Sequence, residues 1–141
     1  MTDSLQTLQT RIGYQFNDVD LLNLSLTHAS RTLARDRTSS NERLEFLGDR
    51  VLGLVVAAML YERFPNEEEG ALSRRFTALV RKESLARVAT DLNIHEDIIL
   101  SRAENDTGGR DNPAIMADAC EAIIGAMFLD GGYDAAQSFI K

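Results

Sequence analysis

Apolar residues along this chain recur at intervals of three or four positions, which is the spacing of α-helices that bury one face. No stretch has the sustained alternation of apolar and polar residues that predicts a half-buried β-strand. The periodic segments predict short helices at 4–12 and 19–29, long helices at 41–63 and 67–90, and further helices at 113–129 and 133–140. The predicted fold is therefore an all-α helical bundle.

Local start and stop signals set the predicted boundaries. They are Phe64-Pro65 after the first long helix, Asn112-Pro113 before the helix at 113–129, and Asp130-Gly131-Gly132 between the last two helices. Proline cannot continue a helix but fits its first turn, and asparagine is a favoured N-cap. The polar segment 31–40 and the charged, glycine-containing segment 101–111 predict loops, and we expect the loop at 101–111 to be mobile.

Composition bounds the class of protein. The 141 residues provide for one domain, spanning 1–141, and 44% of them are hydrophobic. The polar start of the chain lacks the features of a signal peptide, and the longest apolar run, 51–60, is too short to cross a bilayer. Cys120 is the only cysteine, so no internal disulfide forms, and a cytoplasmic location is expected. The net charge of −7 argues by itself against a nucleic-acid-binding protein.

The first long helix carries an acidic face. At about 100° per residue, Glu42, Glu45 and Asp49 fall within an arc of roughly 60°. The expected core stripe lies on the opposite side and consists of Leu44, Leu47, Val51, Leu54, Val55 and Ala58. A solvated acidic face remains an equal alternative at this point. However, Phe46 and Leu52 are predicted on the carboxylate side, where large apolar residues suggest a surface for a partner.

Two glycines interrupt the same helix. Gly48 and Gly53 should each cost about 0.5–1 kcal/mol relative to alanine. The close approach of another backbone would explain them, and so would ordinary tolerance.

Asp118 and Glu121 are one helical turn apart in a segment that is otherwise apolar or small. No Lys or Arg lies between Arg110 and Lys141, so neither acid has a basic partner on its own helix. Two like charges about 5 Å apart repel by about 3 kcal/mol at an effective dielectric constant of 20. A distant arginine, a raised pKa or a divalent cation must offset this repulsion. Oxygen ligands without nearby His or Cys favour Mg²⁺ or Mn²⁺. The alternative is one neutral buried carboxyl beside one exposed glutamate.

Glu42 and Glu69 also fit a purely structural role. Glu42 is three positions after Ser39 and Glu69 is three positions after Asn66, which is the spacing of a capping box at a helix start. Glu45, Asp49, Asp118 and Glu121 have no such explanation.

Four motifs resemble the ribonuclease III family, in the family's order and over nearly the whole chain. They are Leu26-Thr27-His28-Ala29-Ser30, the signature Glu42-Arg43-Leu44-Glu45-Phe46-Leu47-Gly48-Asp49, Phe64-Pro65 with Glu69-Gly70, and Ala117-Asp118 with Glu121-Ala122, Gly125-Ala126 and Phe128 to Gly132. The signature at 42–49 is highly specific for this family.

The resemblance implies a homodimeric all-α nuclease that cuts double-stranded RNA during RNA processing, leaving a 5′-phosphate and a short 3′ overhang. It implies that Glu45, Asp118 and Glu121 bind Mg²⁺, which Mn²⁺ can replace, and that Asp49 and Glu121 are catalytic. Glu42 and Glu69 then have supporting roles in RNA contact or positioning. Phe46 is the knob that enters a pocket of the partner subunit. No membrane association or small-molecule cofactor is implied.

The chain departs from the resemblance in two ways. Arg50 stands where a small residue is expected, and it could contact RNA or the partner. The sequence stops at Lys141, without the C-terminal double-stranded-RNA-binding domain of typical members, so we expect a piece of a longer protein. Candidate phosphate contacts are Arg74, Arg75, Arg81, Lys82 and Arg87, with weaker candidates at Arg102 and Arg110, although a solvated face explains them equally well. His28 and His95 are expected to be structural or exposed and not catalytic.

Two other functions remain open from the residues alone. One is an all-α pyrophosphohydrolase that hydrolyses nucleoside triphosphates with Mg²⁺, and the other is an RNA-binding relative that does not cleave. A non-cleaving relative is expected to have lost some acids, whereas all six acidic positions are filled here.

Overall fold

The computed structural model describes residues 2–31 and 40–140. The predicted loop at 31–40 lies almost entirely outside the described residues. Ser39, the proposed capping partner of Glu42, lies outside them as well.

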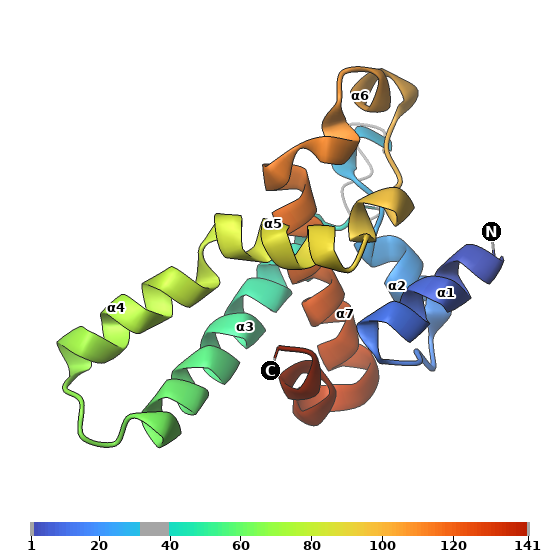
Figure 1. Cartoon of the computed structure of the whole chain (residues 1–141). Coiled ribbons are helices and arrows are strands. Elements are labelled where there is room, and N and C mark those ends of the chain that lie inside the picture. The colour runs from blue at the N-terminus through green and yellow to red at the C-terminus, as the bar shows by residue number, and fades with distance from the viewer. Residues whose placement is uncertain (1, 32–39, 141) are drawn as a thin grey trace.

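The described chain is helical, as the periodicity predicts, and its α-helices are joined by short 3₁₀ turns (Figure 1). The α-helices are α1 (Thr2–Ile12), α2 (Val19–Ser25), α3 (Glu42–Arg63), α4 (Glu69–Val80), α5 (Lys82–Asp91), α6 (Arg102–Asp106) and α7 (Pro113–Ile140). In the parts of the chain that the structure describes, no helix is both long and apolar enough to cross a membrane.

Helix α7 is the centre of the bundle, because apart from Asp118 and Glu121 its segment 115–127 is apolar or small on every side. Most of its residues from Ile115 to Met127 are buried. The helices α3, α5 and α2 pack around it, and α3 and α4 form a hairpin that extends to one side (Figure 1). At Gly132 the backbone adopts a φ of 80°, which kinks α7 at the predicted boundary between its two helical parts.

Glycines allow α3 and α7 to approach closely. A Cβ atom built at Gly48 would overlap the carbonyl oxygen of Glu121, and one at Gly125 would overlap the carbonyl oxygen of Leu44. The interpretation of Gly48 as a close-approach residue is therefore confirmed. Gly53 differs, because its Cβ would meet only the ring of Phe76, at an ordinary 3.5 Å.

The single helix predicted at 67–90 is wrong. The backbone of Arg81 is extended, with ψ at 154°, and this residue separates α4 from α5. At about 100° per residue, the buried positions of α5 (Leu85, Ala86 and Ala89) point roughly 115–120° away from the apolar positions of α4 (Leu72, Phe76, Leu79 and Val80). One straight helix could not bury both sets, so the chain breaks and α5 turns across α7.

For two residues of α3 the predicted burial is wrong. Leu54, predicted in the core, is 60% exposed, whereas Leu52, predicted on a partner surface, is 5% exposed. Leu52 is covered because α4 and α5 fold back over this side of α3, where Leu79 and Leu85 lie beside it. The buried face of α3 is therefore wider than a stripe against α7 alone.

The segment predicted as a loop at 101–111 contains the short helix α6. Ser101 caps this helix by accepting a hydrogen bond from the backbone N–H of Glu104. Arg110 donates to the backbone carbonyls of His95 and Ile98. Arg110 is thus engaged within the protein, which replaces its interpretation as a phosphate contact.

Other details differ in smaller ways. The helix predicted at 19–29 ends at Ser25, and the predicted capping box at Asn66 does not form, because Glu68 is the N-cap of α4 and makes no side-chain cap. His28 is structural, as expected, since its Nδ1 atom lies 2.9 Å from the Ser30 hydroxyl.

Candidate metal centre

Three carboxylates meet where α3 passes beside α7. Glu45 comes from the first turn of α3, and Asp118 and Glu121 come from one face of α7. One oxygen of each lies within 4.8 Å of the others. Oxygens bound to one Mg²⁺ lie at most about 4.2 Å apart, twice the metal–oxygen distance, so only a small contraction is needed. The predicted convergence of acids from two helices is therefore present.

The close approach of the helices creates this geometry. The carbonyl oxygen that faces Gly48 belongs to Glu121 itself. Glu45 is three positions before Gly48, so its side chain is on the same side of α3 and reaches the α7 acids. The glycine contact therefore sets the distance between the carboxylates.

Glu45 and Glu121 line an open cleft of about 490 Å³, together with Lys82, which contacts Asp118. Its lining residues are Glu42, Glu45, Phe46, Asp49, Arg50, Val80, Arg81, Lys82 and Glu121. Asp49 forms a 2.9 Å ion pair with Arg50, and its carboxyl is close enough to Glu121 to raise the pKa of that residue. The four acids that fit no capping box in the sequence thus lie together, with Glu42 at the edge of the group.

Glu69 is the predicted site residue that this arrangement does not include. It is exposed at the first residue of α4, whereas the cleft contains Val80 at the last. The helix between them spans about 16 Å along its axis. A supporting role for Glu69 therefore requires RNA or a second subunit to reach it.

Burial weakens the acidity of two of the three candidate ligands. Desolvation by burial, followed by the charge of Asp118, raises the pKa of Glu45 to about 7. Desolvation by burial, followed by the hydrogen bond with Asp49, raises the pKa of Glu121 to about 8. In the metal-free protein these carboxyls are therefore partly protonated near neutral pH. A divalent cation needs them ionised, so its binding releases protons and strengthens as the pH rises.

A basic residue that the sequence interpretation did not connect with these acids also contacts them. Lys82, the first residue of α5, places its Nζ atom 2.6 Å from Oδ1 of Asp118. The hydrogen bond with Asp118 raises the pKa of Lys82 above its usual value. The break at Arg81 brings this lysine over α7. The change in apolar phase between α4 and α5 was the sequence signal that could have revealed it.

The donor set fits a hard divalent cation. All three ligands offer carboxylate oxygens, and the chemistry of Mg²⁺ and Mn²⁺ favours such oxygens over nitrogen or sulfur. Cys120 is buried one residue before Glu121 but offers no ligand, because burial raises the pKa of its thiol to about 12.

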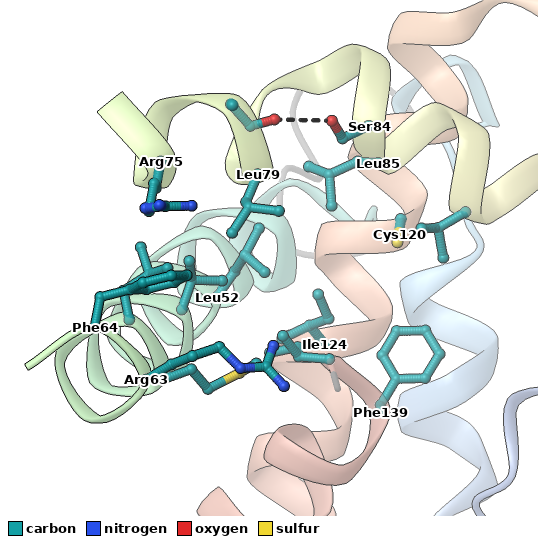
Figure 2. Close-up of a pocket in the computed structure, with 16 residues that line it drawn as sticks. Leu52, Arg63, Phe64, Arg75, Leu79, Ser84, Leu85, Cys120, Ile124 and Phe139 are labelled. Atoms are coloured by element: carbon teal, nitrogen blue, oxygen red, sulfur yellow. Dashed lines mark hydrogen bonds between the residues drawn. The ribbon is translucent and has the colours of Figure 1, made fainter. Parts of the chain in front are cut away.

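Another hollow, of about 540 Å³, lies between α3, α4, α5 and α7 (Figure 2). Its wall is mainly apolar and includes Leu52, Leu79, Leu85, Ile124 and Phe139. Arg63 and Arg75 lie at its edge, and the guanidinium carbon of Arg75 is 3.7 Å from the ring centre of Phe64. Arg75 also forms a 2.8 Å ion pair with Glu67, so it is held in place within the protein.

Fold and site together define an α-helical protein with a carboxylate centre, at the crossing of two helices, that suits a divalent cation. The model of the family described as ribonuclease-III-like matches residues 18–141. The chain belongs to this family.

Curated relatives match almost all of this chain. It is 50% identical to ribonuclease 3 of Bradyrhizobium diazoefficiens over 141 residues, 99% of this chain and 56% of the relative. It is 49% identical to ribonuclease 3 of Bordetella petrii, over 97% of this chain and 52% of the relative. The chain therefore spans about half the length of these relatives.

Solved structures agree on the fold. The nuclease domain of ribonuclease III from Campylobacter jejuni superposes with a TM-score of 0.90 at 42% identity, over 96% of this chain and 92% of that chain. That structure is described as flexible in a region involved in dimer formation. Dicer from Pichia stipitis superposes with a TM-score of 0.64 at 27% identity, over 85% of this chain and 50% of that chain. The predicted nuclease-domain bundle is thus confirmed.

Proposed function

We propose that this chain is the catalytic domain, spanning 1–141, of a cytoplasmic Mg²⁺-dependent endoribonuclease. It hydrolyses phosphodiester bonds of double-stranded RNA and leaves a 5′-phosphate and a short 3′ overhang. The observation that carries the proposal is the convergence of Glu45, Asp118 and Glu121 within 4.8 Å, beside an open cleft that Glu45 and Glu121 line. The identity of about half with proteins named ribonuclease 3 supports the same reaction.

Glu45, Asp118 and Glu121 are the residues that would hold the ion. When bound, Mg²⁺ supplies a Lewis acid for the phosphate and an acidified water as nucleophile. Asp49 is half exposed, lines the open cleft and lies close enough to Glu121 to affect its pKa. From there its carboxylate can orient the attacking water and accept its proton. Because the cleft is open, the bound RNA itself must exclude bulk water from the site.

The acidic net charge is compatible with this substrate. The cleft edge carries the basic side chains of Arg50 and Arg81, which are mostly exposed and can meet phosphates. The carboxylates repel RNA only while no cation neutralises them. We therefore assign the acids to the metal and the basic edge to the duplex, which removes the objection raised by the charge of −7.

A direct test uses end-labelled duplex RNA with millimolar Mg²⁺, with Mn²⁺ in its place, and with excess chelator. We expect cleavage with either ion and none with chelator. Single-stranded RNA and nucleoside triphosphates serve as the controls and should remain intact. Hydrolysis of the triphosphates in place of the duplex, or duplex binding without cleavage, contradicts the proposal.

We also propose that the chain acts as a homodimer in which Phe46 enters the apolar hollow of the partner subunit. Phe46 is 63% exposed, and the guanidinium carbon of Arg50 lies 4.2 Å from its ring centre. An exposed aromatic ring and a mainly apolar hollow in the same molecule are complementary surfaces for two identical chains. The dimer-forming region described for the Campylobacter jejuni structure supports this arrangement.

Phe46→Ala should therefore weaken dimerisation. A buried aromatic anchor contributes about 2–4 kcal/mol, and a twofold dimer has two of them, so the dimer Kd should rise at least about 1000-fold. Sedimentation equilibrium measures the change. Val19→Ala is the matched control, because Val19 is also an exposed apolar residue but lies on α2. An unchanged Kd for Phe46→Ala, or a monomeric wild-type protein, would remove this contact from the proposal.

A further inference from the structure

Lys82 is the basic residue in direct contact with the metal-ligand group. Its Nζ atom is 2.6 Å from Asp118, and its charge also acts on Glu45 and Glu121. Each of the three ligand carboxylates thus interacts with this one ammonium group. In the metal-free protein the lysine therefore supplies the positive charge that the ligands otherwise lack.

The helix itself does not explain this position. Lys82 is the first residue of α5, where the helix dipole disfavours a cation and favours an acid such as Glu83. The lysine therefore destabilises α5 slightly, and only its interaction with the carboxylates offsets this effect. It is also loosely held, because its side chain is 58% exposed. A flexible, exposed ammonium group can leave Asp118 without rearrangement of the core.

We propose that Lys82 is a tethered counter-cation, which occupies the place of the metal ion against Asp118 and is displaced when a divalent cation binds. This inference rests on the divalent-cation site of the proposed function. An ammonium group 2.6 Å from Oδ1 of Asp118 would repel a divalent cation bound to the same carboxylate, so the two cations compete for Asp118. The lysine thereby sets how tightly the ion is held.

The expected consequence is tighter metal binding after removal of the lysine charge. Lys82→Met keeps the length of the apolar stem but deletes the ammonium. The ion then has no competing ammonium group at Asp118, and its Kd should fall by roughly three- to tenfold, a modest change because the exposed pair is screened. Isothermal titration with Mn²⁺ and with Mg²⁺ measures this Kd in the absence of RNA.

Arg87→Met is the matched control. Arg87 is exposed on the same helix, and its substitution removes the same formal charge at a site outside the cleft lining. Its Kd should stay within about twofold of the wild-type value, because a screened charge at a distance acts weakly. Equal tightening in both variants would attribute the effect to net charge and overturn the specific role of Lys82.

An independent measurement uses the wild-type protein, so it does not depend on whether a variant folds. The chain has two lysines, Lys82 and Lys141, so ¹³Cε-labelled lysine gives two signals. Titration with diamagnetic Mg²⁺ should move the Lys82 signal with the midpoint found by calorimetry and leave that of Lys141 in place. A Lys82 signal that stays constant while Mg²⁺ binds overturns the proposal.

The outcomes separate this inference from the function on which it rests. If neither the wild-type protein nor Lys82→Met binds a divalent cation, the proposed metal centre fails, and the lysine proposal fails with it. If the wild-type protein binds the ion but Lys82→Met binds it equally well, only the lysine proposal fails. If Lys82→Met does not fold, as judged by circular dichroism, the lysine signals of the wild-type protein decide.

Discussion

Glu121→Gln should lower the rate of Mg²⁺-dependent duplex RNA cleavage by roughly a thousandfold, which corresponds to about 4 kcal/mol of lost transition-state stabilisation. The substitution keeps the shape of a buried side chain but removes the charge that a cation requires. The fold should survive, because burial raises the pKa of Glu121 to about 8 and the carboxyl is already mostly neutral at pH 7. The measurement is the single-turnover rate with saturating enzyme and Mg²⁺.

Asp49→Asn tests the same site from its exposed side and should also reduce the rate strongly. The control is Glu62→Gln, since Glu62 is exposed near the other end of α3 and does not line the cleft. It should cleave at the wild-type rate. If Glu121→Gln and Asp49→Asn both retain more than about a tenth of the wild-type rate, the assignment of the site is wrong.

The acidic faces could be predicted from the sequence because they depend on local helix geometry. The spacing of Glu45 and Asp49 places both on one side of any regular helix, and Asp118 and Glu121 follow the same rule. The contact between the two acidic faces could not be predicted in this way. The meeting depends on the contact of Gly48 with α7, and spacing within one helix carries no information about that distance.

How the charges of the acids are offset could not be determined from the sequence alone. The sequence left a distant arginine, a raised pKa and a divalent cation as alternatives. The structure has raised pKa values at Glu45 and Glu121, together with a lysine in place of an arginine. Lys82 is 36 positions from Asp118, so their contact arises only from the turn of α5 across α7.

The errors on α3 have a related cause. A single buried stripe was assumed, which placed Leu54 inside and Leu52 outside. In the structure α3 contacts α7 on one side and α4 on the other, so its buried arc is wider and turned toward Leu52. Phe46 remains outside this arc and 63% exposed, in agreement with its prediction as a surface residue.

Another large effect is expected on stability. Gly48→Ala should lower the free energy of unfolding by about 3 kcal/mol or more. The new methyl group would overlap the Glu121 carbonyl oxygen, which is backbone within a buried helix and cannot rotate away. The helices must separate, and the distance between Glu45 and Glu121 grows with them. Urea unfolding in the presence of chelator measures the loss, and calorimetry should find weaker Mn²⁺ binding.

Gly53→Ala on the same helix is the control, and its effect should have the opposite sign. The methyl group there meets only the Phe76 ring at 3.5 Å, so the higher helix propensity of alanine should raise stability by about 0.5–1 kcal/mol. Both substitutions add one methyl group to α3, and they differ only in the atoms that this methyl group meets. If both changed stability by the same amount, helix propensity alone would explain them, and the glycine contact would no longer account for the position of the acids.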